Sequence, residues 1–171
     1  MVFCTHLQEM HKSNAITPLV YRLPFSNQQV VLMPAALNTF SSYRQTGEAS
    51  EAGGLLFATF DLPFIRIAEV SEPHILDGRH RYRFFPNRLL QRRLIRKKFK
   101  QGLHYIGEWH THPEPAPHPS YLDLESMAEA FVKSRHRLNW FIMIIVGNKE
   151  ESLKLWVGAH NSFTYYKLRR T

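Results

Sequence analysis

Cysteine and long apolar runs are scarce in this chain of 171 residues. A single cysteine, Cys4, excludes an internal disulfide framework and fits a reducing compartment. No stretch approaches the ~20 consecutive apolar residues that span a bilayer. The first residues have neither the basic nor the apolar region of a signal peptide. We therefore expect a soluble, cytoplasmic protein without a membrane partner.

The chain contains the material for one hydrophobic core. Hydrophobic residues make up 44% of the sequence and aromatic residues 13%, and the charged fraction is 21%, which excludes a long disordered or collagen-like chain. The length is close to that of one ordinary domain, and no internal repeat is present. We expect an irregular N-terminal lead-in over residues 1–27, with one short strand in it, and a single domain over residues 28–171.

The spacing of apolar residues, prolines and glycines predicts helices interleaved with strands. Helices are expected over residues 34–46, 88–101 and 120–136. Strands are expected over residues 19–22, 28–33, 53–60, 64–70, 82–85, 103–112, 140–146, 153–157 and 162–168. The unbroken apolar run Trp140–Val146 indicates a strand that is covered on both faces. This order of elements predicts an α/β or α+β fold with a mixed sheet.

Two histidines lie two residues apart in Glu108-Trp-His-Thr-His112, at the end of a predicted strand. Because side chains alternate along a strand, both imidazoles are expected on one face, which suits a divalent metal with ligands at about 2.0–2.2 Å. A stiff proline-rich loop then leads to Ser120 and Asp123. Aspartate occurs only three times in the chain, so His-x-His followed by Ser-x-x-Asp at this distance has a chance expectation of roughly 10⁻³.

This arrangement has the features of a hydrolytic metal site. Three protein ligands leave a fourth position open, which is the catalytic pattern for zinc, and a water molecule bound there has its pKa lowered to about 7. Hydrolysis also needs a base that does not coordinate the metal. Glu51-Ala-Gly-Gly54 supplies one at the start of a predicted strand, where two glycines would let the backbone approach the site closely.

Ordinary structural explanations compete with these assignments. Ser-x-x-Asp before an apolar helix is also an N-terminal cap, and Ser120 and Asp123 can serve both purposes. Paired histidines on a strand can be surface residues.

Other residues could carry part of the chemistry. Glu108 shares a face with the histidines and is a rival base or a residue of the rim, and Glu48 is a weaker rival. His118 lies in the proline-rich loop and is expected to be solvent-exposed rather than a ligand. Cys4 beside His6 suggests thiol chemistry, although a lone cysteine is ordinarily inert.

Together these motifs resemble the JAMM signature of the JAB/MPN metalloproteases, in motif order and element order, over about residues 28–160. The matching segments are Glu51-x-Gly-Gly, Gly107-Glu-Trp-His110-x-His112-Pro and Ser120-x-x-Asp123. The resemblance implies the JAB/MPN, cytidine-deaminase-like fold, a mixed β-sheet flanked by helices. It also implies Zn²⁺ as the cofactor, held by His110, His112 and Asp123. Glu51 is then the general base and proton shuttle, and Ser120 the donor that stabilises the tetrahedral oxyanion.

The resemblance further implies a function. Members of this family cleave isopeptide or peptide bonds after the C-terminal tail of ubiquitin or a ubiquitin-like protein. The wording Gly-Glu-Trp-His-Thr-His-Pro-Glu-Pro is most similar to compact bacterial members, some of which accompany E1-like and E2-like enzymes in antiphage or conjugation operons. We therefore expect a zinc-dependent, deubiquitinase-like isopeptidase. Its expected partners are a ubiquitin-like protein or its conjugate, together with E1-like and E2-like enzymes.

Basic residues exceed acidic ones, 22 against 14, which gives a net charge of +8 and an isoelectric point of about 9.8. Ten of the 22 lie within Arg79–Lys100. This segment fits an acidic face of a ubiquitin-like partner, nucleic acid, or simply a solvated helix face. Aromatic residues interleave poorly with it, which argues against a stacking platform for single-stranded nucleic acid.

Two alternatives to the isopeptidase remain open at this stage. Two histidines and a carboxylate also describe non-haem Fe(II) oxygenases, although that assignment leaves Ser120 and Glu51 without roles. The other alternative is a non-catalytic scaffold or nucleic-acid binder that uses the basic segment over residues 79–100. The sequence leaves the oligomeric state open.

Overall fold

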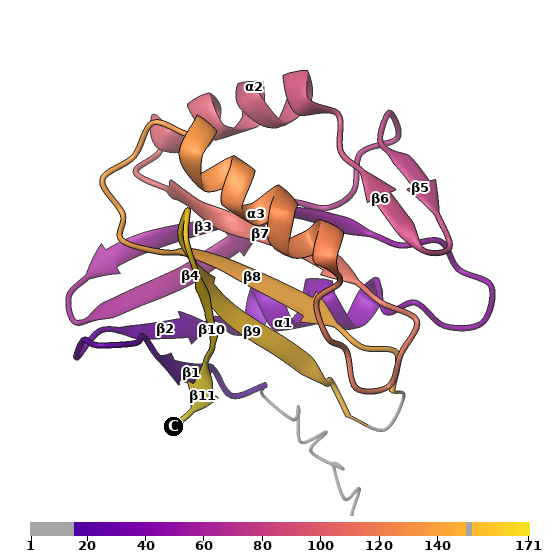
Figure 1. Ribbon diagram of the computed structural model, residues 1–171, viewed down its shortest axis with the longest axis horizontal. Helices are drawn as coiled ribbons and strands as arrows, with labels where there is room; N and C mark the ends of the chain where they lie inside the picture. Colours follow the sequence, from indigo (N-terminus) through magenta and orange to yellow (C-terminus); the bar gives the residue numbers. More distant parts are fainter. Residues whose placement is uncertain (1–15, 150–151) are drawn as a thin grey trace, which may run out of the picture.

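The structure is a computed structural model that describes residues 16–149 and 152–171 (Figure 1). Its helices are α1 (Pro34–Ser42), α2 (Arg88–Phe99) and α3 (Tyr121–Lys133). Its strands are β1 (Leu19–Arg22), β2 (Gln29–Leu32), β3 (Gly53–Asp61), β4 (Phe64–Val70), β5 (Gly78–His80), β6 (Arg83–Phe85), β7 (His104–Thr111), β8 (Phe141–Val146), β9 (Leu155–His160), β10 (Tyr165–Lys167) and β11 (Arg169–Arg170). None of the helices in this part of the chain is long and apolar enough to span a membrane.

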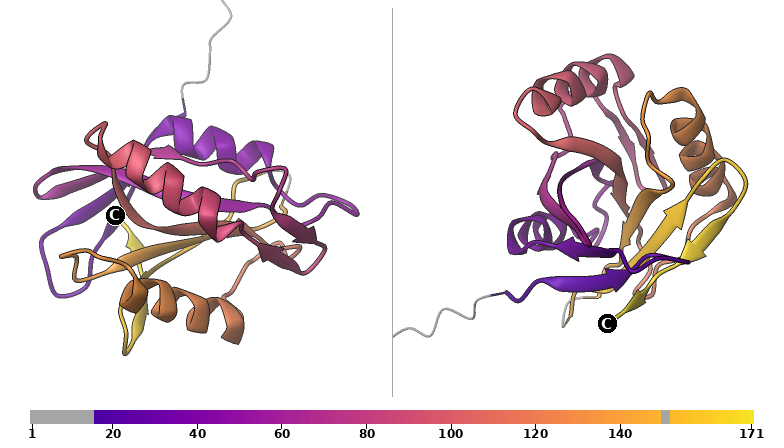
Figure 2. Two further views of the ribbon diagram at one scale, coloured as in Figure 1. Left: turned by 90° about the horizontal axis from the view of Figure 1, so that it is seen from above. Right: turned by 90° about the vertical axis from the view of Figure 1, so that its left-hand side faces the viewer.

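A mixed sheet of nine strands forms the centre of the molecule, in the order β10-β9-β8-β7-β3-β4-β2-β1-β11. The pairs β2–β4 and β7–β8 are parallel, and the others are antiparallel. Only Leu168 separates β10 from β11, which pair at opposite edges of this sheet, so the sheet curls (Figure 2). The strands β5 and β6 form a separate hairpin. The predicted mixed-sheet fold is confirmed.

Helices cover both faces of the sheet, and the alternation of side chains along the strands explains how. Every second residue of β8, namely Ile142, Ile144 and Val146, belongs to the core cluster on the side of α1. Phe40 is one of the residues that α1 contributes to this cluster. The intervening residues of β8 face α3 and pack with its Met127. On β3, Leu55 and Phe57 pack against α2, and Figure 2 shows α1 separated from α2 and α3 by the sheet. The expectation that residues 140–146 are covered on both faces is confirmed for β8.

Several boundaries differ from those expected. The first helix ends at Ser42 rather than near Thr46, because Tyr43 leaves the helical conformation and packs its ring near Trp109. The strand β5 was not predicted, because Gly78–His80 contains no apolar alternation and forms only by pairing with β6. The last strand expected, over residues 162–168, is present only as the shorter β10, and β11, which follows it, was not predicted. Residues 19–22 pair with both β2 and β11 as part of the main sheet.

Gly107 allows β7 to approach β8 immediately before the paired histidines. Its φ is +146°, and a Cβ at this position would lie 1.8 Å from the carbonyl oxygen of Ile142. We therefore expect Gly107→Ala to lower the free energy of unfolding by about 3 kcal/mol or more, as strain and a backbone clash combine. Gly102→Ala is the control, because φ is +79° there but no atom lies within 4 Å of the added carbon. It is expected to cost only about 1–2 kcal/mol in urea denaturation, and equal losses would contradict the clash.

Candidate active site

The paired histidines converge at the end of β7. Their Nε2 atoms lie 3.1 Å apart and their ring centroids 4.9 Å apart, which agrees with the expectation that both rings share a face. Trp109 and Thr111, which alternate with them, are buried. The amide of His112 donates to the carbonyl oxygen of Val146 at 2.9 Å, so the chain stays attached to β8 just beyond the end of the strand.

Asp123 reaches both imidazoles from the first turn of α3. Its Oδ1 lies 3.3 Å from Nε2 of His110, and its Oδ2 lies 3.4 Å from Nε2 of His112. The same carboxylate accepts a hydrogen bond from the backbone amide of Ser120 at 2.7 Å, while the hydroxyl oxygen of Ser120 accepts one from the amide of Asp123 at 3.2 Å. This reciprocal pair is a capping box. The cap therefore fixes the carboxylate that faces the histidines.

The three side chains fit a divalent metal ion. One donor atom from each of His110, His112 and Asp123 lies within 4.8 Å of the others. The shorter separations of 3.1–3.4 Å are close to the edge of a tetrahedron with ligands at about 2.0–2.1 Å, which is about 3.3 Å. Two imidazole nitrogens and one carboxylate oxygen suit zinc, and the same donor set occurs in non-haem iron sites.

Glu51 lies in the same groove, and the strand register explains why. Gly53 on β3 pairs with His110 on β7, and the residue before it, Ala52, exchanges hydrogen bonds with Thr111. Glu51, next to Ala52, is therefore delivered to the histidine end of β7 and is 6% exposed. It lines a groove of about 560 Å³ together with the three candidate ligands and Ser120.

Burial determines the acidity of this carboxyl group. The pKa of Glu51 is raised to about 7, chiefly because burial desolvates the charged form; His112 opposes this shift, and the carboxylates of Asp123 and Glu114 add to it. Asp123 behaves in the opposite way. Burial alone would raise its pKa, but hydrogen bonds from His110 and His112 outweigh that effect and hold the pKa well below its usual range. One carboxyl group is thus suited to proton transfer near neutral pH and the other to coordination.

The β5–β6 hairpin holds the backbone of Glu51. The amide of Glu51 donates to the carbonyl oxygen of His80 at 2.8 Å, and its own carbonyl oxygen accepts from Nε of Arg79 at 2.8 Å. At Gly54, a Cβ would lie 2.2 Å from the carbonyl oxygen of Ser71 and 2.9 Å from the indole nitrogen of Trp109. Gly54 therefore allows β3 to pack closely against Ser71 and Trp109, whereas the sequence led us to expect a close approach to the metal site.

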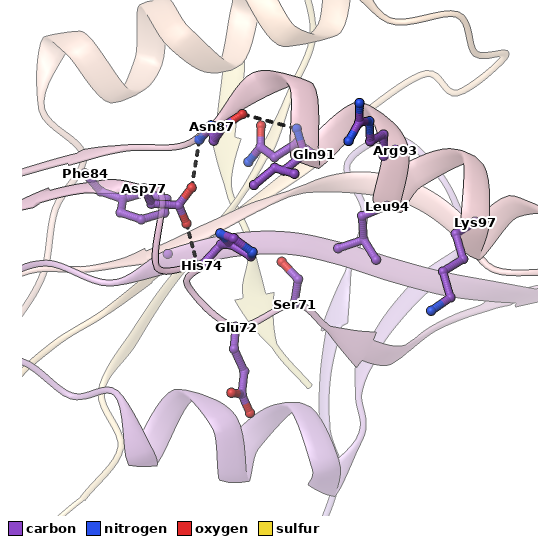
Figure 3. A pocket seen from close by; sticks show the side chains of 13 residues that line it. Ser71, Glu72, His74, Asp77, Phe84, Asn87, Gln91, Arg93, Leu94 and Lys97 are labelled. Carbon is purple, nitrogen blue, oxygen red and sulfur yellow. Dashed lines mark hydrogen bonds between the residues drawn. The ribbon is translucent and has the colours of Figure 1, made fainter.

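The hairpin is attached in turn to α2 (Figure 3). Asp77 accepts hydrogen bonds from the amides of His74 at 2.6 Å and Asn87 at 2.7 Å, and the side chain of Asn87 caps α2 by accepting from the amide of Leu90. These residues line a pocket of about 310 Å³ beneath α2. None of the candidate ligands lines this pocket, which adjoins the groove of Glu51 at Gly54 and Phe84.

The rival residues have other partners. The carboxylate of Glu108 forms an ion pair with Arg88 at 2.9 Å and accepts from the hydroxyl of Tyr105 at 3.2 Å, which places it at the rim of the groove. Glu48 is exposed and pairs with Arg81. His118 lies in the exposed loop, with Nδ1 3.0 Å from the carbonyl oxygen of Ala116. The thiol hypothesis at Cys4 and His6 falls outside the residues that the structure describes.

Sequence reasoning missed one residue that contacts a candidate ligand. The carboxylate of Glu114 lies 3.2 Å from Nδ1 of His112. A carboxylate at one imidazole nitrogen orients the ring and leaves the other nitrogen for a metal. The position of Glu114, two residues after His112 in the sequence, was the available signal.

Comparison with known proteins identifies the family. Residues 34–158 match the prokaryotic homologs of the JAB domain. The chain belongs to this family. The JAB/MPN resemblance inferred from the motifs is thereby confirmed.

Curated relatives and a solved structure cover most of the chain. An Escherichia coli (strain TW11681) protein named CD-NTase/cGAS isopeptidase is 33% identical over 156 residues, covering 89% of this chain and 94% of the relative. A Vibrio cholerae protein with the same name is 32% identical over 133 residues, covering 75% and 80%. The solution structure of a Desulfitobacterium hafniense protein, DSY2949, aligns with a TM-score of 0.61 at 16% identity, covering 81% of this chain and 88% of that one. This last likeness shows the fold alone.

Proposed function

We propose that this protein is a zinc-dependent isopeptidase that hydrolyses the bond between the C-terminal tail of a ubiquitin-like protein and an amine of its conjugate. One observation carries the proposal, namely the convergence of His110, His112 and Asp123 with the buried Glu51 in a single groove. Family membership and the names of the relatives support an isopeptidase over an iron oxygenase. The oxygenase alternative also gives Glu51 no role.

Three side chains of the protein would hold the proposed zinc ion that activates the water molecule. His110, His112 and Asp123 would hold the zinc ion through two nitrogens and one oxygen. When bound, zinc supplies a Lewis acid and lowers the pKa of a water molecule to about 7.

Glu51 moves the protons. Its carboxylate accepts a proton from the attacking water, and the resulting carboxylic acid then donates that proton to the departing amine. In the metal-free chain the pKa of this carboxyl group is about 7, within the range in which a side chain can both accept a proton and return it near neutral pH.

Ser120 stabilises the negative charge that develops on the carbonyl oxygen of the substrate. In the capping box its hydroxyl oxygen acts as an acceptor for the amide of Asp123, so the hydroxyl proton remains available for donation. Its position at the N-terminus of α3 adds the positive end of the helix dipole. A hydrogen-bond donor in such a position is worth roughly 10²–10³ in turnover.

The names of the relatives suggest which conjugates are cleaved. They join an isopeptidase to CD-NTase/cGAS proteins, so we propose that the tail belongs either to a ubiquitin-like protein or to a CD-NTase that is conjugated in the same way. On this proposal E1-like and E2-like enzymes form the conjugate, and this protein cleaves it in the cytoplasm as part of antiviral defence.

Metal removal tests the proposed chemistry. The purified protein is expected to cleave a lysine-linked conjugate, to lose that activity after treatment with 1,10-phenanthroline, and to regain it with one equivalent of Zn²⁺, as followed by gel electrophoresis. Metal analysis of protein purified without added metal should find zinc. Cleavage that survives chelation would contradict the metal assignment, and a protein that contains iron and cleaves no conjugate would favour the oxygenase. Parallel assays with ubiquitin-like and CD-NTase conjugates distinguish the two tails.

A further inference from the structure

A second, larger groove lies between the C-terminal ends of α2 and α3. Its volume is about 1260 Å³, and it is also lined by Phe60 on β3 and by the segment that follows α3. In Figure 1 both helices begin on the side of the β5–β6 hairpin and end on the opposite side, so this groove lies at the far ends of the helices that begin beside the candidate active site. None of the candidate ligands, nor Glu51 or Ser120, lines it. We call it the basic groove.

Cationic side chains line the basic groove from both sides. Arg92 and Arg96 come from α2, one helical turn apart, and Lys133, Arg135 and Arg137 come from the end of α3 and the segment after it. All five are exposed. In the part of the chain that the structure describes, only Lys133 among them has an acidic partner, Glu129.

The positive charge of the basic groove is not balanced by acidic side chains in the described part of its lining. No acidic side chain lines it among the described residues. Basic residues near the end of α2 also complement the helix dipole, but that explanation does not extend to Arg135 and Arg137, which lie beyond α3. Cations on two facing walls create a positive potential that an anionic ligand between them would neutralise.

The floor of the basic groove is aromatic. Phe99 is 63% exposed and Phe60 is 38% exposed. Both rings pack edge-to-face with His104, at centroid distances of 5.5 and 5.3 Å. Ile95 and Leu138 add aliphatic surface. A ligand that matches this groove therefore carries several negative charges and at least one apolar side chain.

These features favour an acidic polypeptide over single-stranded nucleic acid. Bases bind to aromatic rings that offer a free face. Here Phe60 and Phe99 each pack against His104, and the ring of Tyr105 packs against Phe141, so each of these rings is already in contact with another ring of the protein. A packed aromatic floor between cationic walls suits the apolar and acidic side chains of a peptide.

The basic groove is connected to the candidate active site. Tyr105 lines the basic groove, and its hydroxyl donates to Glu108 at 3.2 Å; Glu108 and its partner Arg88 line the groove of Glu51. Both grooves thus lie along β7 between the two helices. A polypeptide that extends from the active site in this direction reaches the cationic walls.

We propose that the basic groove binds an acidic segment of the conjugate that the active site cleaves. That the bound segment belongs to the substrate rests on the proposed isopeptidase function. That the groove binds an acidic peptide is independent of this function, because no catalytic residue lines the groove. The groove would select among conjugates by their charge and would accelerate their association.

Peptide binding tests the groove without reference to catalysis. The probe is a fluorescein-labelled ten-residue peptide of glutamates with one central phenylalanine, measured by fluorescence anisotropy. The variant Arg92→Gln/Arg96→Gln/Arg135→Gln should raise the Kd about tenfold or more at low salt, and binding should weaken with added salt. The control variant Arg22→Gln/Arg169→Gln/Arg170→Gln removes the same charge from exposed positions on β1 and β11. It should change the Kd less than about twofold.

Three results would overturn the proposal: equal weakening in the two variants, no measurable binding by the unmodified protein, or groove-dependent binding of a ten-residue oligothymidylate in preference to the peptide. The last would assign the groove to nucleic acid. Circular dichroism of both variants checks that the fold is retained.

Cleavage kinetics then link the groove to the substrate. For a conjugate that carries the same acidic segment, the groove variant should raise KM with little change in kcat, and a conjugate with glutamines in place of the glutamates should show no such difference. An unchanged KM would contradict the role in substrate selection. If the unmodified protein cleaves no conjugate, the proposed function fails, and the anisotropy result still decides whether the groove binds acidic peptides.

Discussion

Substituting glutamine for Glu51 is expected to lower kcat by about 10³-fold or more while the protein retains its zinc. The amide has nearly the same shape but cannot accept and return a proton, and general acid–base catalysis contributes roughly 10²–10⁴-fold. Metal retention follows because Glu51 is not among the three candidate ligands. The measurements are single-turnover cleavage of a conjugate and metal content after gel filtration. Glu48→Gln is the matched control, because Glu48 is an exposed glutamate paired with Arg81, and it should leave kcat unchanged.

The same substitution should stabilise the metal-free protein above neutral pH. The pKa of Glu51 is about 7 in the folded chain against a reference value of 4.5, so the folded state binds the proton more tightly than the unfolded state. The resulting stabilisation is complete below about pH 4.5 and is lost as the pH rises through 7. At pH 8 the ionised, buried carboxylate therefore costs about 2–3 kcal/mol.

Urea denaturation of the metal-free protein at two pH values measures this cost. Glu51→Gln should gain stability relative to the unmodified protein at pH 8, and the difference should shrink toward pH 5. A variant that is less stable at pH 8 would show that the carboxylate is stabilised by contacts the geometry does not reveal. A variant that turns over normally would remove Glu51 from the mechanism altogether.

Asp123→Ala is expected to have the second large effect, because the carboxylate of Asp123 is both a candidate metal ligand and part of the capping box of α3. The variant loses a metal ligand, so zinc affinity should fall more than about 100-fold, exceeding the effect of losing a residue that only supports a ligand, and turnover should be abolished. It also loses half of the capping box, which should destabilise the metal-free protein by about 1 kcal/mol. Zinc titration and thermal denaturation measure the two losses separately.

The variant Ser120→Ala distinguishes helix capping from metal binding, because Ser120 belongs to the capping box but is not a candidate ligand. It removes the acceptor of the amide of Asp123 and should destabilise the metal-free protein by a similar amount, about 1 kcal/mol. Zinc should stay bound, and kcat should fall by about 10²–10³-fold through loss of the oxyanion donor. A Ser120→Ala variant that cleaved normally would limit this serine to capping. An Asp123→Ala variant with unchanged zinc affinity would refute the assigned ligand set.

The parts of the site that were predicted from sequence follow local rules. The histidines share a face because strands alternate, and Ser120 and Asp123 lie together because a capping box spans four consecutive residues. Glu51 lies 59 residues before His110 in the chain, and its place depends on the register of β3 against β7. That pairing is set by packing over the whole sheet, so spacing alone could not supply it. The sequence offered Glu51 only as a candidate base beside two glycines, and the family resemblance assigned it the role.

The features that escaped prediction depend on partners distant in the sequence. The ion pair of Glu108 with Arg88 joins β7 to α2 across 20 residues. The hairpin strand β5 has no apolar pattern of its own and exists only through pairing with β6. The aromatic floor of the basic groove combines Phe60, Phe99 and His104 from three elements, whereas the sequence showed only a basic segment with few aromatic residues in it.

The attachment of Glu51 to the hairpin makes the position of the proposed base depend on the position of the hairpin. Both backbone polar groups of Glu51 are bonded to residues at the end of β5, so a displacement of the hairpin breaks the bonds that position the base. On the proposed mechanism, a partner that held the hairpin against the sheet would keep the carboxylate in position, whereas one that displaced the hairpin would stop proton transfer while the three candidate ligands stayed in place. An inhibitor that acted on the hairpin would then have no need to contact a metal ion.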